Sequence, residues 1–141
     1  MKALLIGVRS TLLADAALMA LCAGGVHLGR APDNDEDMPY LVMSAPGGWG
    51  PQYYTTRAMQ LERVALRFHA WSVNAEAAVD IMEAVERILR TTPPILADAT
   101  ALDAWKTADS LEIDPDPTDT GHDVWAAVMD YEFMVARNPL I

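Results

Sequence analysis

The stretch Leu61–Leu89, LERVALRFHAWSVNAEAAVDIMEAVERIL, combines two kinds of hydrophobic pattern, one after the other. From Arg63 to Trp71, apolar and polar residues alternate, which is typical of a strand with one buried face. The apolar positions are Val64, Leu66, Phe68 and Ala70, and the positions between them include Arg63, Arg67 and His69. The first half of the stretch is therefore predicted to be a half-buried strand.

The second half of the stretch has the period of an α-helix. Its apolar residues recur every three or four positions and form one stripe: Ala78, Ile81, Met82, Val85, Ile88 and Leu89. The opposite face is charged, with acid and base spaced four residues apart: Glu83 with Arg87, and Glu86 with Arg90. Asn74 is the predicted N-cap, and Thr91–Pro94 ends the helix. A strand and a helix with one apolar face each can pack together as the nucleus of a two-layer domain.

The rest of the chain predicts another helix and further strands around this nucleus. Residues 3–22 are rich in Ala and Leu and predict a first helix, broken near Gly7 and ended by Gly24 and Gly25. Further strands are predicted at Val26–Gly29, Pro39–Met43, 105–113 and Trp125–Val135, with Leu96–Ala104 as an irregular connection. Residues 1–141 are therefore expected to form a single α+β domain, with a mostly antiparallel four- to five-stranded sheet and two main helices packed on one face.

Composition and charge exclude several classes of protein. The chain has 141 residues, of which 52% are hydrophobic, so it can bury a core without disulfides or a structural metal. Its formal net charge of −10 argues against specific nucleic-acid binding, which needs clustered Lys and Arg. Cys22 is the single cysteine, so no disulfide can form within the chain. The apolar start imitates a secretory signal, but Arg9 and Asp15 interrupt it, and no apolar run reaches the ~20 residues of a membrane span.

No pattern of catalytic or metal-binding residues stands out. His27, His69 and His122 lie in different predicted elements, with none of the short spacings of metal ligands. The acidic segments 33–37 and 114–123 begin like calcium-binding loops, but they lack the glycine and the closing glutamate that such loops need. We therefore expect no catalytic residue, no cofactor and no metal site. Solvated turns are one interpretation of both acidic segments.

Residues 45–56 (APGGWGPQYYTT) are rich in Gly and Pro and carry three aromatic residues: Trp49, Tyr53 and Tyr54. They predict a long connection, either a flexible loop or the tip of an extended hairpin. Aromatic residues on such an excursion either fold back onto the domain or anchor a partner, and the sequence leaves both possibilities open. Trp105 shares the parity of Leu111 and Ile113 in a predicted strand, so these three residues are expected on one face of it.

The order of these pieces resembles one known family along nearly the whole chain. Four features carry the resemblance: the N-terminal helix ending at Gly24 and Gly25, the segments 26–32 (VHLGRAP) and 39–42 (PYLV) around an acidic loop, the strand and helix from Val64 to Leu89, and the closing strand 130–135 (DYEFMV) after the Thr120–Gly121 turn. In this order they resemble the tail terminator or tail-completion proteins of long-tailed phages and gene transfer agents. The segment 47–54 departs from the family pattern.

This resemblance implies a structural virion protein and not an enzyme. Such proteins share an α+β fold and form a hexameric ring at the head-proximal end of the tail tube. The ring stops tube polymerisation and joins the tail to the head connector. The implied partners are further copies of the chain, the tail tube protein and the head-tail connector protein. DNA passes through the channel without specific binding, no membrane is involved, and assembly takes place in the host cytoplasm.

The resemblance also suggests roles for particular residues. Trp49, Tyr53 and Tyr54 would contact a neighbouring subunit or the tube, with Arg57 pairing an acid across that contact. The acidic loops would line the channel or the head-facing rim, through Asp33, Asp35, Glu36, Asp37, Asp114, Asp116 and Asp119.

The alternative from the residues alone is a small acidic ligand-binding or metal-assisted hydrolytic domain, using His69 or His122 with nearby acids. That alternative predicts a concave site of convergent polar groups. A ring protein predicts instead large apolar patches on two sides of the subunit.

Overall fold

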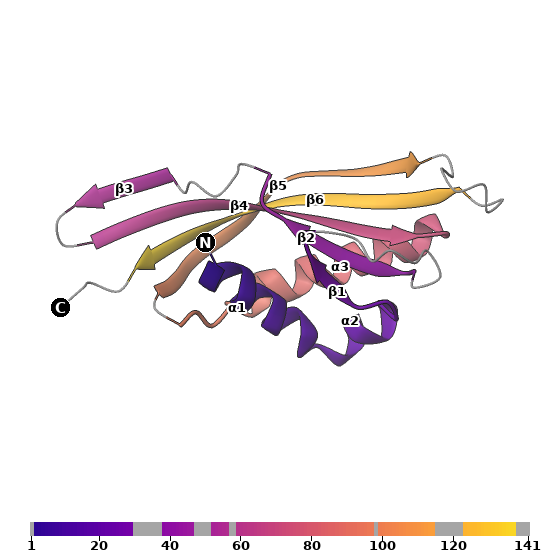
Figure 1. Cartoon of the computed structure of the whole chain (residues 1–141), viewed down its shortest axis with the longest axis horizontal. Coiled ribbons are helices and arrows are strands. Elements are labelled where there is room, and N and C mark those ends of the chain that lie inside the picture. Colours follow the sequence, from indigo (N-terminus) through magenta and orange to yellow (C-terminus); the bar gives the residue numbers. More distant parts are fainter. Residues whose placement is uncertain are drawn as a thin grey trace.

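The computed structural model describes residues 2–29, 38–46, 52–56, 59–97, 99–114 and 123–137, and it shows a sheet covered on one face by helices (Figure 1). In chain order, the elements are α1 (Lys2–Leu13), α2 (Ala16–Leu21), β1 (Val26–Leu28), β2 (Tyr40–Ser44), β3 (Gln52–Thr56), β4 (Met59–Ser72), α3 (Ala75–Thr91), β5 (Ala99–Asp114) and β6 (Val124–Arg137). None of the described helices is both long and apolar enough to cross a membrane. The predicted α+β class is confirmed.

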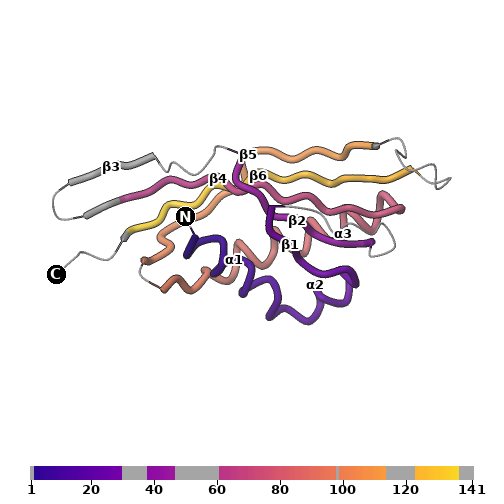
Figure 2. The backbone as a smooth tube through the Cα atoms, viewed as in Figure 1, coloured from indigo at the N-terminus to yellow at the C-terminus, as the bar shows by residue number. Residues whose placement is uncertain are grey.

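The sheet has the strand order β1-β2-β4-β6-β5, and β3 pairs with the first residues of β4. β1 and β2 are parallel, and the other described pairs are antiparallel, so the predicted antiparallel character is confirmed. The long strands β4 and β6 run side by side through the middle of the molecule (Figure 2). β2 and β3 share one side of β4, at opposite ends of it, while β6 and β5 lie on the other side.

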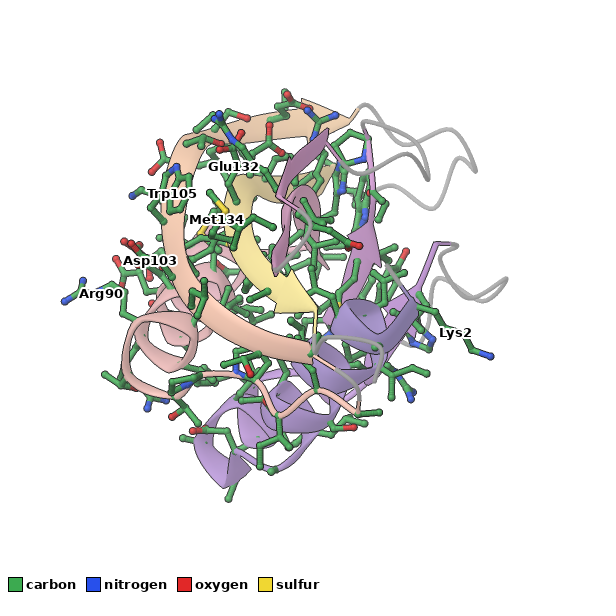
Figure 3. All side chains as sticks on the ribbon, turned by 90° about the vertical axis from the view of Figure 1, so that its left-hand side faces the viewer. Lys2, Arg90, Asp103, Trp105, Glu132 and Met134 are labelled. Atoms are coloured by element: carbon green, nitrogen blue, oxygen red, sulfur yellow. The ribbon has the colours of Figure 1, made fainter. Side chains whose placement is uncertain are left out.

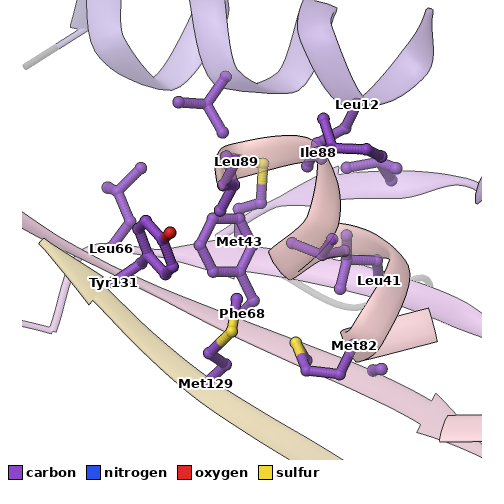
Figure 4. Packing of buried hydrophobic residues seen from close by; sticks show 14 of the residues in the cluster. Leu12, Leu41, Met43, Leu66, Phe68, Met82, Ile88, Leu89, Met129 and Tyr131 are labelled. Atoms are coloured by element: carbon purple, nitrogen blue, oxygen red, sulfur yellow. The ribbon is translucent and has the colours of Figure 1, made fainter. Parts of the chain in front are cut away.

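The core lies between the helices and one face of the sheet, which we call the inner face. The alternation predicted for β4 is confirmed, because Val64, Leu66, Phe68 and Ala70 are at most 2% exposed. Phe68 packs among side chains from β2, β6 and α3 (Figure 4), and these include Met43, Met129, Met82 and Leu89. The opposite face of the sheet, which we call the outer face, carries no helix from the described part of the chain.

The helices begin and end where local chemistry allows. All six residues of the stripe predicted for α3 are buried, and the Asn74 side chain accepts hydrogen bonds from the N–H groups of Glu76 and Ala77, as predicted for an N-cap. The predicted first helix is two helices, α1 and α2. Asp15 caps α2 by accepting a hydrogen bond from the Leu18 N–H, which also holds the pKa of Asp15 below its usual value.

The predicted break near Gly7 is wrong, because Gly7 lies inside α1. A Cβ atom at Gly7 would lie 2.6 Å from the carbonyl oxygen of Ile95 and 2.7 Å from Leu96 Cδ2. Glycine is therefore present because another segment passes close to the helix at this point, and not because the helix ends there.

The predicted irregular connection at Leu96–Ala104 is wrong from Ala99 onward, where β5 begins. β5 has two register shifts opposite β6, one between Ala101 and Asp103 and one between Lys106 and Ala108. Each shift adds a residue to β5 and interrupts the alternation of its side chains. Because of these two shifts, the first half of β5 lacks the alternation by which a strand is recognised in a sequence.

The charged face of α3 pairs with other elements. Arg87 Nη2 lies 3.4 Å from Asp15 Oδ1, and Glu86 Oε2 lies 3.5 Å from Lys106 Nζ. Among the ion pairs of the described residues, neither pair predicted along the helix occurs, so that prediction is wrong. The acids and bases tie α3 to α2 and to β5 instead.

Candidate functional site

The structure describes part of the segments that the sequence analysis identified. Tyr53 and Tyr54 lie in β3, and Asp114 is the last residue of β5. The other candidate residues lie outside the described part of the chain: Trp49, Arg57, Asp33, Asp35, Glu36, Asp37, Asp116, Asp119 and His122. Their roles stay predictions, and the candidate surfaces are built from the sheet itself.

β3 and the start of β4 form an antiparallel hairpin. The register places Thr56 opposite Met59, Tyr54 opposite Leu61 and Tyr53 opposite Glu62, so two residues join the strands. Of the segment 45–56, residues Gln52–Thr56 therefore form one arm of a hairpin, and residues 47–51 lie outside the described part of the chain. Within the described residues, β3 pairs with β4 alone, which leaves its other edge available to a partner.

The outer face of the sheet carries two ion pairs between β4 and β6. Arg67 donates to both carboxylate oxygens of Asp130, from Nε at 2.7 Å and from Nη2 at 3.0 Å. This hydrogen-bonded guanidinium holds the pKa of Asp130 below its usual value. Arg63 donates to Glu132 at 2.7 Å and lies over the Trp105 ring, 5.8 Å from its centroid. Figure 3 shows Trp105 and Glu132 close together on neighbouring strands.

His69 lies on the same face, half-buried, with its ring stacked on Trp71 at a centroid distance of 6.1 Å. Burial, and then the nearby charge of Arg67, lower the pKa of His69, so the ring is neutral at pH 7. A polar pocket of about 330 Å³ lies between Arg67, His69, Glu112 and Asp130. The Arg67 guanidinium repels a cation there, and the described residues contain no group of three or more His, Cys, Asp or Glu that could hold a metal ion.

β5 is the last strand on its side of the sheet, and its second half is exposed. Residues Ala108–Asp114 pair with β6 without a register shift. Leu111 and Ile113 are 46% and 49% exposed, which is high for large apolar side chains. Three of the seven residues are acids: Asp109, Glu112 and Asp114. A regular, exposed edge strand of this kind is a template for pairing with a strand of another chain.

A groove of about 320 Å³ runs between α3 and this half of β5. Its apolar lining residues are Val79, Met82, Leu111, Ala127 and Met129, together with Val128. Its charged residues are Glu83, Glu86, Asp109 and Lys106. Lys106 Nζ lies 2.9 Å from Asp109 Oδ2 and 3.5 Å from Glu86 Oε2, so it bridges the two sides of the groove. The groove keeps a net negative charge.

The sequence analysis missed the edge of β5 as a candidate site. It placed Trp105, Leu111 and Ile113 on one face of a strand, and this prediction is wrong. The register shift after Lys106 puts Trp105 opposite Glu132 on the outer face, whereas Leu111 lies opposite Ala127 on the inner face. The available signal was a pair of large apolar residues between acids, just before a sequence segment rich in Asp and Pro.

Comparisons with known proteins agree with this fold. No curated protein sequence matches the chain. Among solved structures, a chain of the virion of a native gene transfer agent (GTA) particle superposes with a TM-score of 0.68 at 16% sequence identity, and 96% of each chain is covered. The gp17 protein of bacteriophage SPP1 superposes with a TM-score of 0.57 at 21% identity, over 94% of this chain and 88% of that one. At these identities, the two structures show a shared fold.

The sequence profile of the family described as "Tail completion protein gp17" matches residues 7–136. The match covers α1 from Gly7 onward, α2, α3 and the whole described sheet apart from the last residue of β6. The chain therefore belongs to the tail completion protein gp17 family.

Proposed function

We propose that the chain is a structural protein of a phage or gene transfer agent virion, and that it forms a hexameric ring at the head-proximal end of the tail tube. The ring stops polymerisation of the tube and joins the tail to the head connector. The observation that carries this proposal is the match of residues 7–136 to a tail completion family. Membership of that family suggests a structural rather than a catalytic role.

The fold supports a ring because it offers two different surfaces for neighbours. A closed ring needs a heterologous interface, in which one patch of a subunit meets a different patch of the next. β3 lies on one side of β4, and the exposed half of β5 lies on the other side, beyond β6. Each subunit can therefore contact one neighbour through the hairpin side and another through the β5 side.

The net charge of the chain fits a channel for DNA. Each subunit carries a formal charge of −10, so a ring of six is strongly acidic. An acidic ring repels the phosphates of DNA, which lets a genome slide through without specific binding. The acidic segments 33–37 and 114–123 are the candidates for the channel or for the rim that faces the head connector.

The aromatic residues of the hairpin segment are the candidates for the contact with a neighbouring subunit or with the tube. Changing Trp49, Tyr53 and Tyr54 together to Ala should abolish ring formation or head-tail joining, because aromatic anchors carry much of the energy of such contacts. Joining is measured by the infectivity or gene-transfer activity of particles assembled in vitro. Rings that form and join normally with all three changes would remove these residues from the interface.

The function itself is tested by tube growth. Tail tube protein that polymerises alone gives tubes of broad length distribution, and the chain added during growth should bind tube ends and shorten that distribution. Lengths are measured by negative-stain electron microscopy, with bovine serum albumin at the same concentration as a control for a nonspecific acidic protein. Unchanged tube lengths, with no chain at tube ends and no binding to connectors, would contradict the proposal.

A further inference from the structure

The described sheet has three strands with an open side, and two of these edges are partly blocked. β1 has three residues, and Arg9 of α1 donates from Nε to the Val26 carbonyl at 3.1 Å. The first half of β5 carries two register shifts and a bridge between Ile95 and Thr100. Short length, bulges and capping groups are the devices by which proteins prevent pairing at an edge. They leave two regular edges in the described chain, β3 and the second half of β5.

The second half of β5 lacks the usual protection. Residues Ala108–Asp114 continue for seven residues without a shift, and Leu111 and Ile113 expose almost half of their side-chain surface. The acids Asp109, Glu112 and Asp114 discourage pairing with a second acidic edge, but not with a neutral or basic strand. β3 is such a strand, because Gln52–Thr56 contains no charged residue and Arg57 follows it.

We propose that the edge of β5 from Ala108 to Asp114 receives the β3 strand of a second copy of this chain, so that the sheet continues from one subunit to the next. This inference rests on the ring proposed above and names the surfaces that close it. The acids of β5 are then the candidates for the acid that the sequence analysis expected opposite Arg57, a residue outside the described part of the chain. Leu111 and Ile113 are covered by the incoming strand.

The positions of the two edges suit head-to-tail assembly. β3 pairs with Met59–Arg63, whereas Ala108–Asp114 lies level with Arg67–Ser72 near the other end of β4. At about 3.3 Å per residue, the two edges are roughly 30 Å apart along the sheet. They also face opposite sides of it. One subunit therefore cannot satisfy its own β5 edge with its own β3, and pairing requires a second copy.

The first test places charge on the receiving edge. In a double variant with Leu111→Lys and Ile113→Lys, association between subunits should weaken at least about tenfold, because two apolar side chains at the contact are replaced by charged ones. Both residues are exposed in the subunit, so the fold should survive, as checked by circular dichroism and the melting temperature. The matched control is Leu102→Lys, a 54% exposed leucine in the bulged half of the same strand, which should leave association unchanged.

The second test blocks the donor strand. The two-residue connection makes Thr56 and Met59 a hydrogen-bonded pair, so the backbone N–H of Thr55 points away from β4. Thr55→Pro removes that donor, and proline is tolerated on the open side of an edge strand. The ring should be lost in Thr55→Pro and kept in Thr55→Val, which retains the N–H group and the β-branched shape.

A mixture of the two defective variants separates a broken interface from a misfolded chain. Thr55→Pro keeps an intact β5 edge, and the Leu111→Lys, Ile113→Lys variant keeps an intact β3, so together they should form a complex with the mass of two chains. Mass is measured by light scattering, with the tail tube protein present if the wild type needs it to assemble. Rings that persist in the Lys variant or in Thr55→Pro, or a mixture with no two-chain complex, would overturn the pairing of β3 with β5 but not the ring itself. A wild-type chain that stays monomeric in every condition would overturn the ring as well.

Discussion

At the scale of single residues, the ion pair between Arg67 and Asp130 makes stability depend on pH. The pKa of Asp130 is lower in the folded chain than in the unfolded chain, first because Arg67 donates hydrogen bonds to the carboxylate. The pair therefore contributes stability above the unfolded pKa of about 3.9, and this contribution is lost as the pH falls through the folded value.

Asp130→Asn should lower the free energy of unfolding at pH 7 by on the order of 0.5–1 kcal/mol, a small value because the Arg67 side chain is 40% exposed. As the pH falls below 5, the free energy of unfolding of the variant should decrease less steeply than that of the wild type. Urea denaturation at several pH values measures both effects. The control is Asp80→Asn on the exposed face of α3. If the stability of Asp130→Asn fell with decreasing pH as steeply as that of the wild type, the role of this ion pair would be disproved.

Gly7 provides a second test at the same scale. Alanine normally stabilises a helix interior by about 0.8–1.0 kcal/mol relative to glycine. Here the added Cβ meets the Ile95 carbonyl at 2.6 Å, so Gly7→Ala should instead destabilise the chain by about 1–3 kcal/mol. Thermal unfolding measures the change, and Ser10→Ala on the exposed side of α1 should be neutral or slightly stabilising. A Gly7→Ala variant more stable than the wild type would show that the segment at Ile95 moves away easily.

The residue scale also shows where sequence reasoning succeeds. Asn74 was predicted as an N-cap because a cap depends on the residue and the next few N–H groups, and the structure confirms it. The partners of Glu86 and Arg87 were predicted wrongly, since Lys106 and Asp15 are distant in sequence and outcompete the helix neighbours. Local chemistry is visible in a sequence, whereas contacts between distant elements are not.

At the scale of elements, the packing of α1 is tested by two adjacent leucines. Leu12 is fully buried, and Leu13 is 40% exposed. Leu12→Ala should lower the free energy of unfolding by about 2–5 kcal/mol, because it removes buried methyl groups and leaves a cavity. Leu13→Ala should change it by about 0.5 kcal/mol or less. Similar costs for the two variants, measured by urea denaturation, would contradict the placement of this helix on the sheet.

Elements could be predicted from the sequence where their side chains follow one period. β4 and α3 have uninterrupted patterns, and their predicted buried residues are buried. β5 has two bulges, so the sequence analysis found only its second half and misplaced Trp105 relative to Leu111. The exposure of Leu111 and Ile113 depends on which strand stands at the edge of the sheet. Strand order is a property of the whole fold, and no local pattern reveals it.

At the scale of the whole molecule, the open sheet edges suit the ring proposed above. The family match covers residues 7–136, and the sheet inside that range leaves regular edges on two sides of β4. A chain that acted as an isolated monomer would have no use for two such edges, which natural proteins normally protect. We therefore propose that subunits assemble head to tail into a closed ring that ends the tail tube.

The most direct test of this claim is the native mass of the purified chain, measured by light scattering alone and in the presence of the tail tube protein. A single subunit has a mass of 15.4 kDa, so the two possible results are well separated. A closed ring predicts a mass near six subunits, after subtraction of any bound tube protein, in at least one of the two samples. A strict monomer in both samples, with no effect on the length of the tubes, would contradict it.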